Sequence, residues 1–468
     1  MVEVAPGCRR AARLPLSAAV LLAAGMAGTA PVQAGSWKLG SSVSLVETYT
    51  DNIGLVETGA ESRFFTQVVP RVTLSREGGR AKVNLSASVR YDTAGGGSGS
   101  LTPQLNGTAK VELIRQRLFV DANARISRTA INPFGPIGVD DLNRTGNATT
   151  TYQLGISPYY KDRLRDLGEM ELRYRVNSTR HSGGTAQNSL SQSVDFSLRS
   201  LAGPPLSWGL RARYRHSGNS GSSNTDLAST DLTLGYRFNR KWSVDASAGR
   251  EWNDYASTRT RTGGFRWTLN TTWTPNSRTR VRIGYGDRFF GSTPSLDVRY
   301  RHRRSTLKAS YVKTVTDANT TLNAIGIDPV TGDLFPVAIL QNDVFVDERF
   351  TGSYTLKGKR TTLNLSVTHS SQTYENSPQS SELAKYGVSL TRTLPGKTRL
   401  SASLNWYQQD RSAGSKADTL QVSLGINRPI AAKTSLGLRY SFNRRDDDNP
   451  GSSYDENRVA LTLSHTIK

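Results

Sequence analysis

The chain has 468 residues, and its 60 Lys and Arg against 38 Asp and Glu give a formal net charge of +22 at pH 7. Hydrophobic residues make up only 36%, which is low for a soluble globular chain of this length, and the single Cys excludes a disulfide framework. After the N-terminal segment no apolar run is long enough for a membrane-spanning helix, so a helical membrane protein is excluded.

Residues 1–34 have the pattern of a secretory signal peptide. Three Arg between residues 9 and 13 precede the apolar run LPLSAAVLLAAGMAG, and the small-residue sequence VQA ends at residue 34. A basic start, an apolar stretch too short to cross a bilayer comfortably and a cleavage site of small residues are the three parts of such a signal. We expect it to be removed, together with the only Cys, and residues 35–468 to form one exported domain; a retained anchor helix is the less favoured alternative.

From residue 37 onward, apolar and polar residues alternate in short segments. Leu232, Leu234 and Tyr236, for example, alternate with Thr233 and Gly235. A period of two is typical of a strand with one apolar face, and it argues against disorder. The pattern predicts 22 strands and no helix. The predicted strands are 37–49, 64–76, 80–92, 104–115, 117–128, 149–160, 168–178, 189–200, 206–217, 226–238, 242–252, 262–274, 278–290, 295–302, 304–315, 344–356, 360–373, 382–394, 398–409, 416–427, 434–443 and 457–468.

Tight and long connections alternate along the chain. EGG at 77–79, NRK at 239–241 and PGK at 395–397 are tight, whereas the connections at 51–62 and 443–456 are long and polar. Bacterial outer-membrane barrels have this arrangement, with short periplasmic turns and long extracellular loops. We therefore predict an all-β fold: a single antiparallel up-and-down transmembrane β-barrel in the bacterial outer membrane, with an even number of strands, about 22. A β-solenoid or an array of β-sandwiches is disfavoured, because connection lengths vary and no break between units is visible.

Arg residues gather on the strand faces opposite the apolar residues. In GLRARYRHSG at 209–218, three odd positions are Arg, and the even positions are apolar or aromatic. Because an Arg that faces hydrocarbon costs about 2–4 kcal/mol near the midplane, we expect these side chains to face the lumen. The predicted anion-binding residues of the lumen are Arg211, Arg213, Arg215, Arg278, Arg280, Arg282, Arg299, Arg301 and Arg303.

Two interpretations of this basic lumen stay open, and they are not exclusive. A wall of one charge sign concentrates counter-ions, and Arg binds carboxylate and phosphate through two hydrogen bonds, which indicates a conduit or binding surface for anionic solutes. Alternatively, acids on neighbouring strands neutralise the Arg in a structural ladder. The acids predicted to face the lumen are Glu171, Asp195, Asp231, Asp245 and Asp297.

The remaining motifs give weaker signals. The loop 316–343 contains DPVTG, which predicts a hairpin; we favour an elongated extracellular hairpin over an inward constriction. The acids at 446–448 offer oxygen ligands to Ca²⁺ or Mg²⁺, but a solvated acidic loop is favoured. The segment 305–308 fits S-x-x-K without its companion motifs, and the five His show no metal spacing. We expect no catalytic residue, no metal site and no cofactor.

The opening of the exported domain resembles a known bacterial family. VETYTDNIGL at 46–55 and RFFTQVVPRVTLSREGGRAKVNLSASVRY at 63–91 are similar to segments of outer-membrane β-barrel proteins associated with PEP-CTERM/exosortase systems. Those proteins in turn resemble porin-like barrels of exopolysaccharide loci. The match covers the first two hairpins. It implies a role in the export of surface polysaccharide or in the sorting of surface proteins, and it supplies no catalytic residues.

We therefore expect a non-enzymatic barrel with an Arg-rich lumen, a porin or conduit connected with exopolysaccharide export or PEP-CTERM-type protein sorting. A plugged structural or receptor barrel of a cell-envelope assembly is the alternative, and an outer-membrane hydrolase is a third, weaker hypothesis. The expected partners are outer-membrane lipids and lipopolysaccharide, with an anionic polysaccharide or envelope export components in addition. The signal peptide and the lipid-facing strands argue against a nucleic-acid partner.

Overall fold

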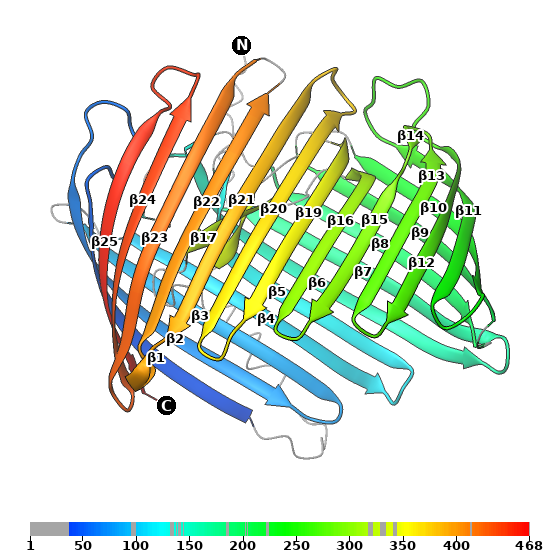
Figure 1. The fold of residues 1–468 in the computed structure, drawn as a ribbon, viewed down its shortest axis with the longest axis horizontal. Coiled ribbons are helices and arrows are strands. Elements are labelled where there is room, and N and C mark those ends of the chain that lie inside the picture. Colours follow the sequence, from blue (N-terminus) through cyan, green and yellow to red (C-terminus); the bar gives the residue numbers. More distant parts are fainter. Residues whose placement is uncertain are drawn as a thin grey trace, which may run out of the picture.

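Every predicted strand is present, and the wall strands pair antiparallel in chain order (Figure 1). The computed structural model describes residues 37–467 apart from 95–99, 132–134, 137, 139–141, 144, 184–186, 202, 204, 221–223, 317–321, 328–333, 340–343 and 412–413. Within these residues, 22 strands form the barrel wall. They are β1 (Trp37–Thr50), β2 (Arg63–Glu77), β3 (Ala81–Ala94), β4 (Ser100–Ile114), β5 (Leu118–Ala130), β6 (Ala148–Leu164), β7 (Gly168–His181), β8 (Ser189–Ser200), β9 (Leu206–Asn219), β10 (Thr225–Arg237), β11 (Trp242–Asp254), β12 (Gly264–Asn276), β13 (Thr279–Arg288), β15 (Ser295–His302), β16 (Ser305–Thr316), β19 (Phe345–Lys357), β20 (Thr361–Tyr374), β21 (Ser380–Thr393), β22 (Arg399–Arg411), β23 (Lys416–Ala431), β24 (Thr434–Asp447) and β25 (Tyr454–Thr466).

The first and last strands close the sheet on itself. β1 pairs antiparallel with β25, in a register that runs from Ser42 opposite Thr466 to Thr50 opposite Arg458. A closed sheet has no free edge, so every wall strand has a hydrogen-bonded neighbour on both sides. The predicted signal peptide, residues 1–34, lies outside the described residues.

The outer face of the wall is apolar and the inner face is polar, the reverse of a soluble protein. Tyr214 and Ile283, on the outer face, are 49% and 59% exposed, whereas the inward-facing Gln67 and Asn405 are 0% and 2% exposed. Such an exterior is stable against hydrocarbon, and the closed strand pairing leaves no unpaired backbone facing lipid. The fold therefore places the chain in the bacterial outer membrane.

The two ends of the barrel differ as the connection lengths predict. In Figure 1 the tight turns lie along the lower edge and the long loops along the upper edge. The ten tight turns are 78–80, 115–117, 165–167, 201–205, 238–241, 277–278, 303–304, 358–360, 394–398 and 432–433. The last but one contains the 3₁₀ turn η1 (Pro395–Lys397), in which Gly396 has a φ of 70° that favours glycine. Short turns mark the periplasmic end of an outer-membrane barrel.

Among the described residues, no helix is long and apolar enough to cross a membrane.

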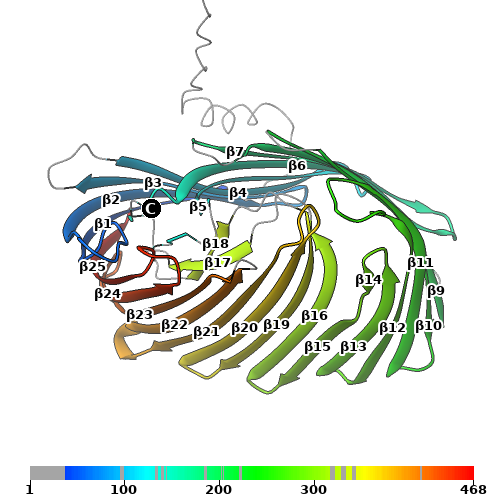
Figure 2. The same cartoon turned by 90° about the horizontal axis from the view of Figure 1, so that it is seen from above.

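The predicted hairpin in the loop after β16 is present, but it does not project outward as we favoured. Its strands, β17 (Leu322–Ile327) and β18 (Leu334–Ile339), pair antiparallel. Seen from above, they lie inside the barrel outline (Figure 2), and Ile339 pairs with Ala130 at the end of β5 on the opposite wall. The backbone of β18 thus pairs with β5 across the lumen. A hairpin that projected into solvent would have no such partner. The two-residue strand β14 (Gly291–Ser292) folds back on β13 in the same end of the barrel.

Replacement of Leu232 by Arg should destabilise the folded barrel by about 2–4 kcal/mol, because Leu232 lies on the outer face near the middle of β10 and a charge there enters hydrocarbon. The neighbouring Thr233 faces the lumen cavity, so Thr233→Arg is the matched control and should change stability by less than about 1 kcal/mol. Urea titration of the barrel folded into lipid vesicles measures both values. Equal destabilisation by the two substitutions would contradict the assignment of the faces.

Candidate functional site in the lumen

Ionic side chains of the lumen concentrate on the strands from β6 to β16, which we call the charged wall. Inward positions on these strands hold Lys161, Arg173, Asp195, Asp231 and Arg282, among others. On the other strands the inward positions are mainly Ser, Thr, Asn and Gln. The strand period of two brings every second residue to this face, so the alternation of charge in the sequence becomes a two-dimensional array of charges on the wall.

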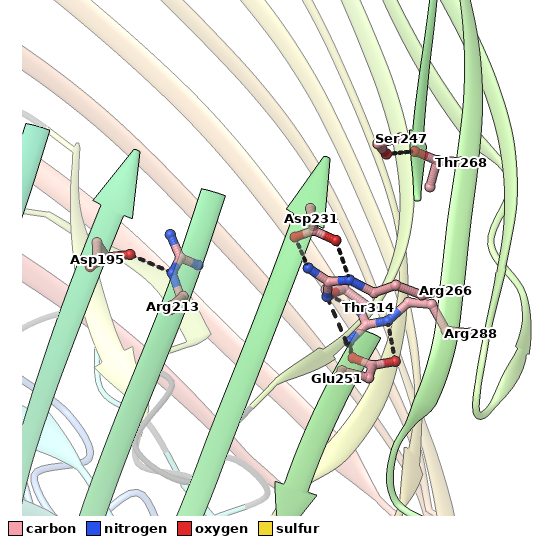
Figure 3. Close-up of polar contacts among 9 residues, drawn as sticks. All are labelled: Asp195, Arg213, Asp231, Ser247, Glu251, Arg266, Thr268, Arg288 and Thr314. Atoms are coloured by element: carbon pink, nitrogen blue, oxygen red, sulfur yellow. Dashed lines mark hydrogen bonds and ion pairs between the residues drawn. The ribbon is translucent and has the colours of Figure 1, made fainter. Parts of the chain in front are cut away.

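Asp195 on β8 is the centre of the first ion-pair network on the charged wall. Its carboxylate accepts hydrogen bonds from Arg175 on β7 and Arg213 on β9, with 2.5 Å between Arg213 Nε and Asp195 Oδ1 (Figure 3). Asp195 and Arg213 lie directly opposite each other in the β8–β9 register. The Arg213 side chain is 54% exposed, so each pair contributes no more than about 1 kcal/mol.

A second and more buried network joins β10, β11, β12 and β13. Arg266 bridges Asp231 and Glu251, and Arg288 forms a two-bonded pair with Glu251 at 2.5 and 3.1 Å (Figure 3). The Glu251 side chain is only 2% exposed. Arg266 reaches Asp231 across Gly249, where an added Cβ would lie 2.6 Å from the Asp231 carboxylate. The glycine therefore keeps open the path of the guanidinium across an intervening strand.

A cavity of about 800 Å³ lies against this wall. Its lining includes Arg211, Asp231, Arg266, Arg288 and Thr314, which come from β9, β10, β12, β13 and β16. Arg288 also donates to Thr314 Oγ1 at 3.4 Å. Cations and carboxylates alternate around the cavity, so it suits a polar or ionic ligand rather than an apolar one.

The structural ladder that the sequence left open is present on most of the charged wall. Of the five acids predicted to face the lumen, four form ion pairs with Arg or Lys: Glu171 with Arg173 and Lys161, Asp195 with Arg175 and Arg213, Asp231 with Arg266, and Asp245 with Arg282. Asp297 is exposed and has no ion pair among the described residues. Much of the predicted excess of positive charge is therefore neutralised within the sheet.

The structure places the predicted anion-binding residues in three different settings. Arg213 and Arg282 are paired with acids, and Arg215 Nε donates to Ser191 Oγ at 3.0 Å. Arg211 lines the cavity, and Arg280 lies on the same face of β13 as Arg282. Whether these side chains bind an anion stays a prediction.

Two of the predicted lumen residues lie elsewhere. Arg278 and Arg303 are in the tight turns 277–278 and 303–304, not on strands, and both are exposed. The prediction used the alternation of inward and outward residues, which holds only within a strand. In a turn the chain reverses direction, so alternation no longer predicts whether a side chain faces the lumen. Arg301 is the last inward position of β15 before the second of these turns.

Three cations on adjacent strands lie directly opposite one another near the periplasmic end of the charged wall. Arg280 on β13 is opposite Arg299 on β15, and Arg299 is opposite Lys308 on β16. We call these three residues the cation row. All three are exposed, and none forms an ion pair with a described residue. Like charges directly opposite each other destabilise a sheet. A bound anion would stabilise the cation row, because no described acid forms an ion pair with it.

On the other side of the lumen, loop residues of the chain contact the wall strands. Arg458 on β25 is only 3% exposed and donates to Asn143 Oδ1 at 2.8 Å, and Asn143 belongs to the loop that follows β5. Asn143 also donates to Glu456 Oε1 at 2.9 Å. Leu142 in the same loop packs against Ile53 and Phe65. The β17–β18 hairpin also lies inside the barrel outline, and β18 pairs with the end of β5 (Figure 2).

A third segment, the loop 255–263, contacts a distant part of the wall at the extracellular end. In the loop 255–263, Arg259 Nε donates to both carboxylate oxygens of Glu375 at 2.9 and 3.1 Å, and Ser257 Oγ donates to the same carboxylate at 2.9 Å. Glu375 follows β20, six wall strands beyond β11, and its side chain is completely buried. Burial, together with the carboxylates of Glu375 and Glu251, raises the pKa of the nearby Tyr255. The phenol therefore stays neutral and adds no charge to this contact.

Sequence reasoning missed several of these residues. Arg266, Arg288 and Glu251 lie at inward positions of predicted strands, so the alternation could have found them. No local signal joins Glu375 to Arg259 or Asn143 to Arg458, because these contacts link segments far apart in the chain. Of the acids at 446–448, Asp446 and Asp448 are exposed, whereas the Asp447 side chain is buried and pairs with Arg445 at 2.6 Å. In the described part of the chain, no group of three or more His, Cys, Asp or Glu is arranged to hold a metal ion.

Replacement of Glu251 by Gln should destabilise the barrel by about 3 kcal/mol, because Arg266 and Arg288 would lose a shared, buried counter-charge. Asp297→Asn is the matched control: it removes an exposed inward carboxylate with no ion pair and should cost less than about 0.5 kcal/mol. Urea unfolding in vesicles compares the two. A Glu251→Gln barrel as stable as the control would show that the buried network does not hold the wall together.

No protein-family model matches the chain, and no curated protein matches it in sequence. Solved structures do match. The siderophore receptor PirA from Acinetobacter baumannii is 9% identical, with a TM-score of 0.55 over 93% of this chain and 81% of that chain. A complex of the ferric enterobactin receptor PfeA from Pseudomonas aeruginosa is 11% identical, with a TM-score of 0.54 over 93% of this chain and 82% of that chain. The FrpB iron transporter from Neisseria meningitidis is 9% identical, with a TM-score of 0.54 over 92% of this chain and 82% of that chain. At these identities the likeness establishes the fold: the chain is a closed 22-stranded β-barrel of the outer-membrane type.

Proposed function

We propose that this barrel is a receptor-type transporter that binds an anionic solute on the charged wall, while its own inward segments obstruct free diffusion through the rest of the lumen. This is closer to the plugged alternative of the sequence analysis than to an open porin. The observation that carries the proposal is the division of the lumen. One side holds a charged cavity of about 800 Å³, and on the other side the β17–β18 hairpin and residues of the loop after β5 make contacts inside the wall.

The cation row supports an anion as the ligand. Arg280, Arg299 and Lys308 face the lumen without counter-charge, and a bound carboxylate or phosphate would relieve their mutual repulsion. Arg offers such groups two parallel hydrogen bonds. The row lies four residues along β15 from Ser295, which lines the cavity, a distance of about 13 Å along an extended strand. A solute that leaves the cavity toward the periplasm would meet the row next.

The structural neighbours support the class of function but not the ligand. They are siderophore receptors and an iron transporter, so in them this fold serves as a receptor or a transporter. We extend to this chain only the class, an outer-membrane receptor or transporter without catalysis. The anionic character of the ligand is inferred from the basic residues on the wall.

An export conduit for an acidic exopolysaccharide, or for a step in PEP-CTERM-type protein sorting, is the second candidate. The basic wall would favour an acidic polymer as it favours a small anion. Against it stands the occupied side of the lumen, because a polymer needs a continuous open path. The interaction with lipopolysaccharide or with envelope export components stays a proposal.

Conductance in planar bilayers should separate the two candidates. A receptor whose lumen is obstructed should give little steady current, whereas a conduit should give a large, anion-selective current. A large current from the wild-type barrel would refute the receptor proposal.

Binding of citrate to the purified barrel, followed by isothermal titration calorimetry, should weaken at least about tenfold in the variant Arg280→Gln/Arg299→Gln/Lys308→Gln, because three charge-assisted contacts are removed. The matched control Arg261→Gln/Lys416→Gln/Arg444→Gln removes three exposed cations near the extracellular end and should leave the affinity unchanged. Citrate affinity that is insensitive to the first variant, or equally sensitive to the second, would place binding outside the cation row.

A further inference from the structure

Charge is distributed very unevenly between the two ends of the barrel. The ten tight turns together contain thirteen Lys or Arg and one acid, Asp166, and nine of the ten contain at least one cation. The exception is 201–205. The eleven long connections contain eleven acids and three cations. They are 51–62, 95–99, 131–147, 182–188, 220–224, 255–263, 289–294, 317–344, 375–379, 412–415 and 448–453. The periplasmic end therefore has a nearly continuous basic rim, and the long connections have no comparable excess of cations.

The cations of the basic rim are available to a partner. All thirteen are exposed, and none forms an ion pair with a described residue. Three turns carry two adjacent cations each: Arg240 with Lys241, Arg303 with Arg304, and Lys359 with Arg360. The cations of the lumen networks, in contrast, are mostly paired with acids on neighbouring strands. In the described residues, rim cations without an acid partner are thus found in nine of the ten turns.

Some rim cations occupy backbone positions that suit other residues better. Arg165, Arg303 and Lys397 have φ values of 42°, 44° and 60°, in the left-handed region where Gly and Asn are favoured. A side chain other than Gly or Asn costs roughly 1 kcal/mol there. The turn geometry alone would thus select a different residue at these three positions.

The rim lies directly beside the lipid-facing surface. Phe238 and Trp242, which are 62% and 44% exposed, flank Arg240 and Lys241 in the sequence. Leu113 and Ile114, each 54% exposed, immediately precede Arg115. Exposed aromatic and apolar residues followed at once by cations are the pattern of a chain that passes from the hydrocarbon into the headgroup layer. The rim cations are therefore at the depth of lipid phosphates.

We propose that the basic rim is an annular binding surface for anionic phospholipid headgroups in the leaflet that faces the periplasm. The partner must have negative charge and must surround the barrel, because the cations occur in nine of the ten turns rather than in one patch. A bilayer leaflet has this geometry, whereas an acidic protein would dock on one side. Basic residues at a membrane surface attract anionic lipids additively. The charge asymmetry then anchors the barrel at a defined depth and orientation, independently of any solute in the lumen.

Relative quenching of the barrel's Trp fluorescence by brominated phosphatidylglycerol and brominated phosphatidylcholine tests the proposal, because it compares the two lipids at the protein surface. With Trp252, Trp267 and Trp406 replaced by Phe, the remaining exposed residues Trp37, Trp242 and Trp273 lie at the periplasmic end and report on that leaflet. At low salt the wild-type barrel should prefer phosphatidylglycerol by at least about threefold, and the preference should fall as salt screens the charges. Equal quenching by both lipids at low salt would overturn the proposal.

The six-substitution variant Arg240→Gln/Lys241→Gln/Arg303→Gln/Arg304→Gln/Lys359→Gln/Arg360→Gln should lose the preference. Its changes are all in exposed turns, so the wall pairing is untouched, and retained heat-modifiability on gels confirms folding. The control Arg261→Gln/Lys416→Gln/Arg444→Gln should keep the wild-type ratio. A preference that survives in the variant overturns the proposal. So does binding of soluble polyglutamate to barrels in pure phosphatidylcholine without any lipid preference, since that result would assign the rim to an acidic protein partner.

Discussion

Hydrocarbon accepts apolar side chains and rejects unpaired backbone groups, and the other features of this chain are arranged around that constraint. It requires a closed sheet, since only closure pairs both edges of β1 and β25. It requires an apolar residue at every second position, and so leaves the alternate positions free to be polar. Ionic chemistry on these strands is thereby confined to the inner face. The lumen of this protein is charged because its exterior cannot be.

The same constraint explains why the wall could be predicted from the sequence. Every one of the 22 predicted strands is present, because a side chain that faces lipid must be apolar whatever its neighbours are. The strand ends were predicted less well. β24 reaches Asp447 and β6 begins at Ala148, beyond the predicted limits, since the wall continues above the hydrocarbon where both faces are polar. There the pattern of two faces disappears although the strand pairing continues.

The contents of the lumen depend on contacts that alternation does not encode. The pairing of Arg213 with Asp195 follows from strand register, and strand register follows from the tight turns, so a ladder was foreseeable. The contacts of Glu375 with Arg259 and of Asn143 with Arg458 join loops to distant strands. They determine how much of the lumen stays open, and hence whether the barrel acts as a conduit or as a receptor. A sequence can thus indicate an outer-membrane barrel while leaving its function undecided.

Position relative to the strand end separates two roles for the same residue type. Arg280 and Arg278 are two residues apart, yet Arg280 is directed to the lumen by the strand register and Arg278 lies in an exposed turn. Arg301 and Arg303 stand in the same relation at the neighbouring turn. Inside the barrel many guanidinium groups are paired with carboxylates on adjacent strands, as those of Arg213 and Arg282 are, although Arg280 and Arg301 form no ion pair with a described residue. Two residues further along the chain, an Arg in the turn lies beyond the last strand pair. The nearest anions are then those of the surrounding solvent and membrane. The excess positive charge of the chain is therefore not a property of the lumen alone: a large part of it belongs to the surface that meets the periplasmic leaflet.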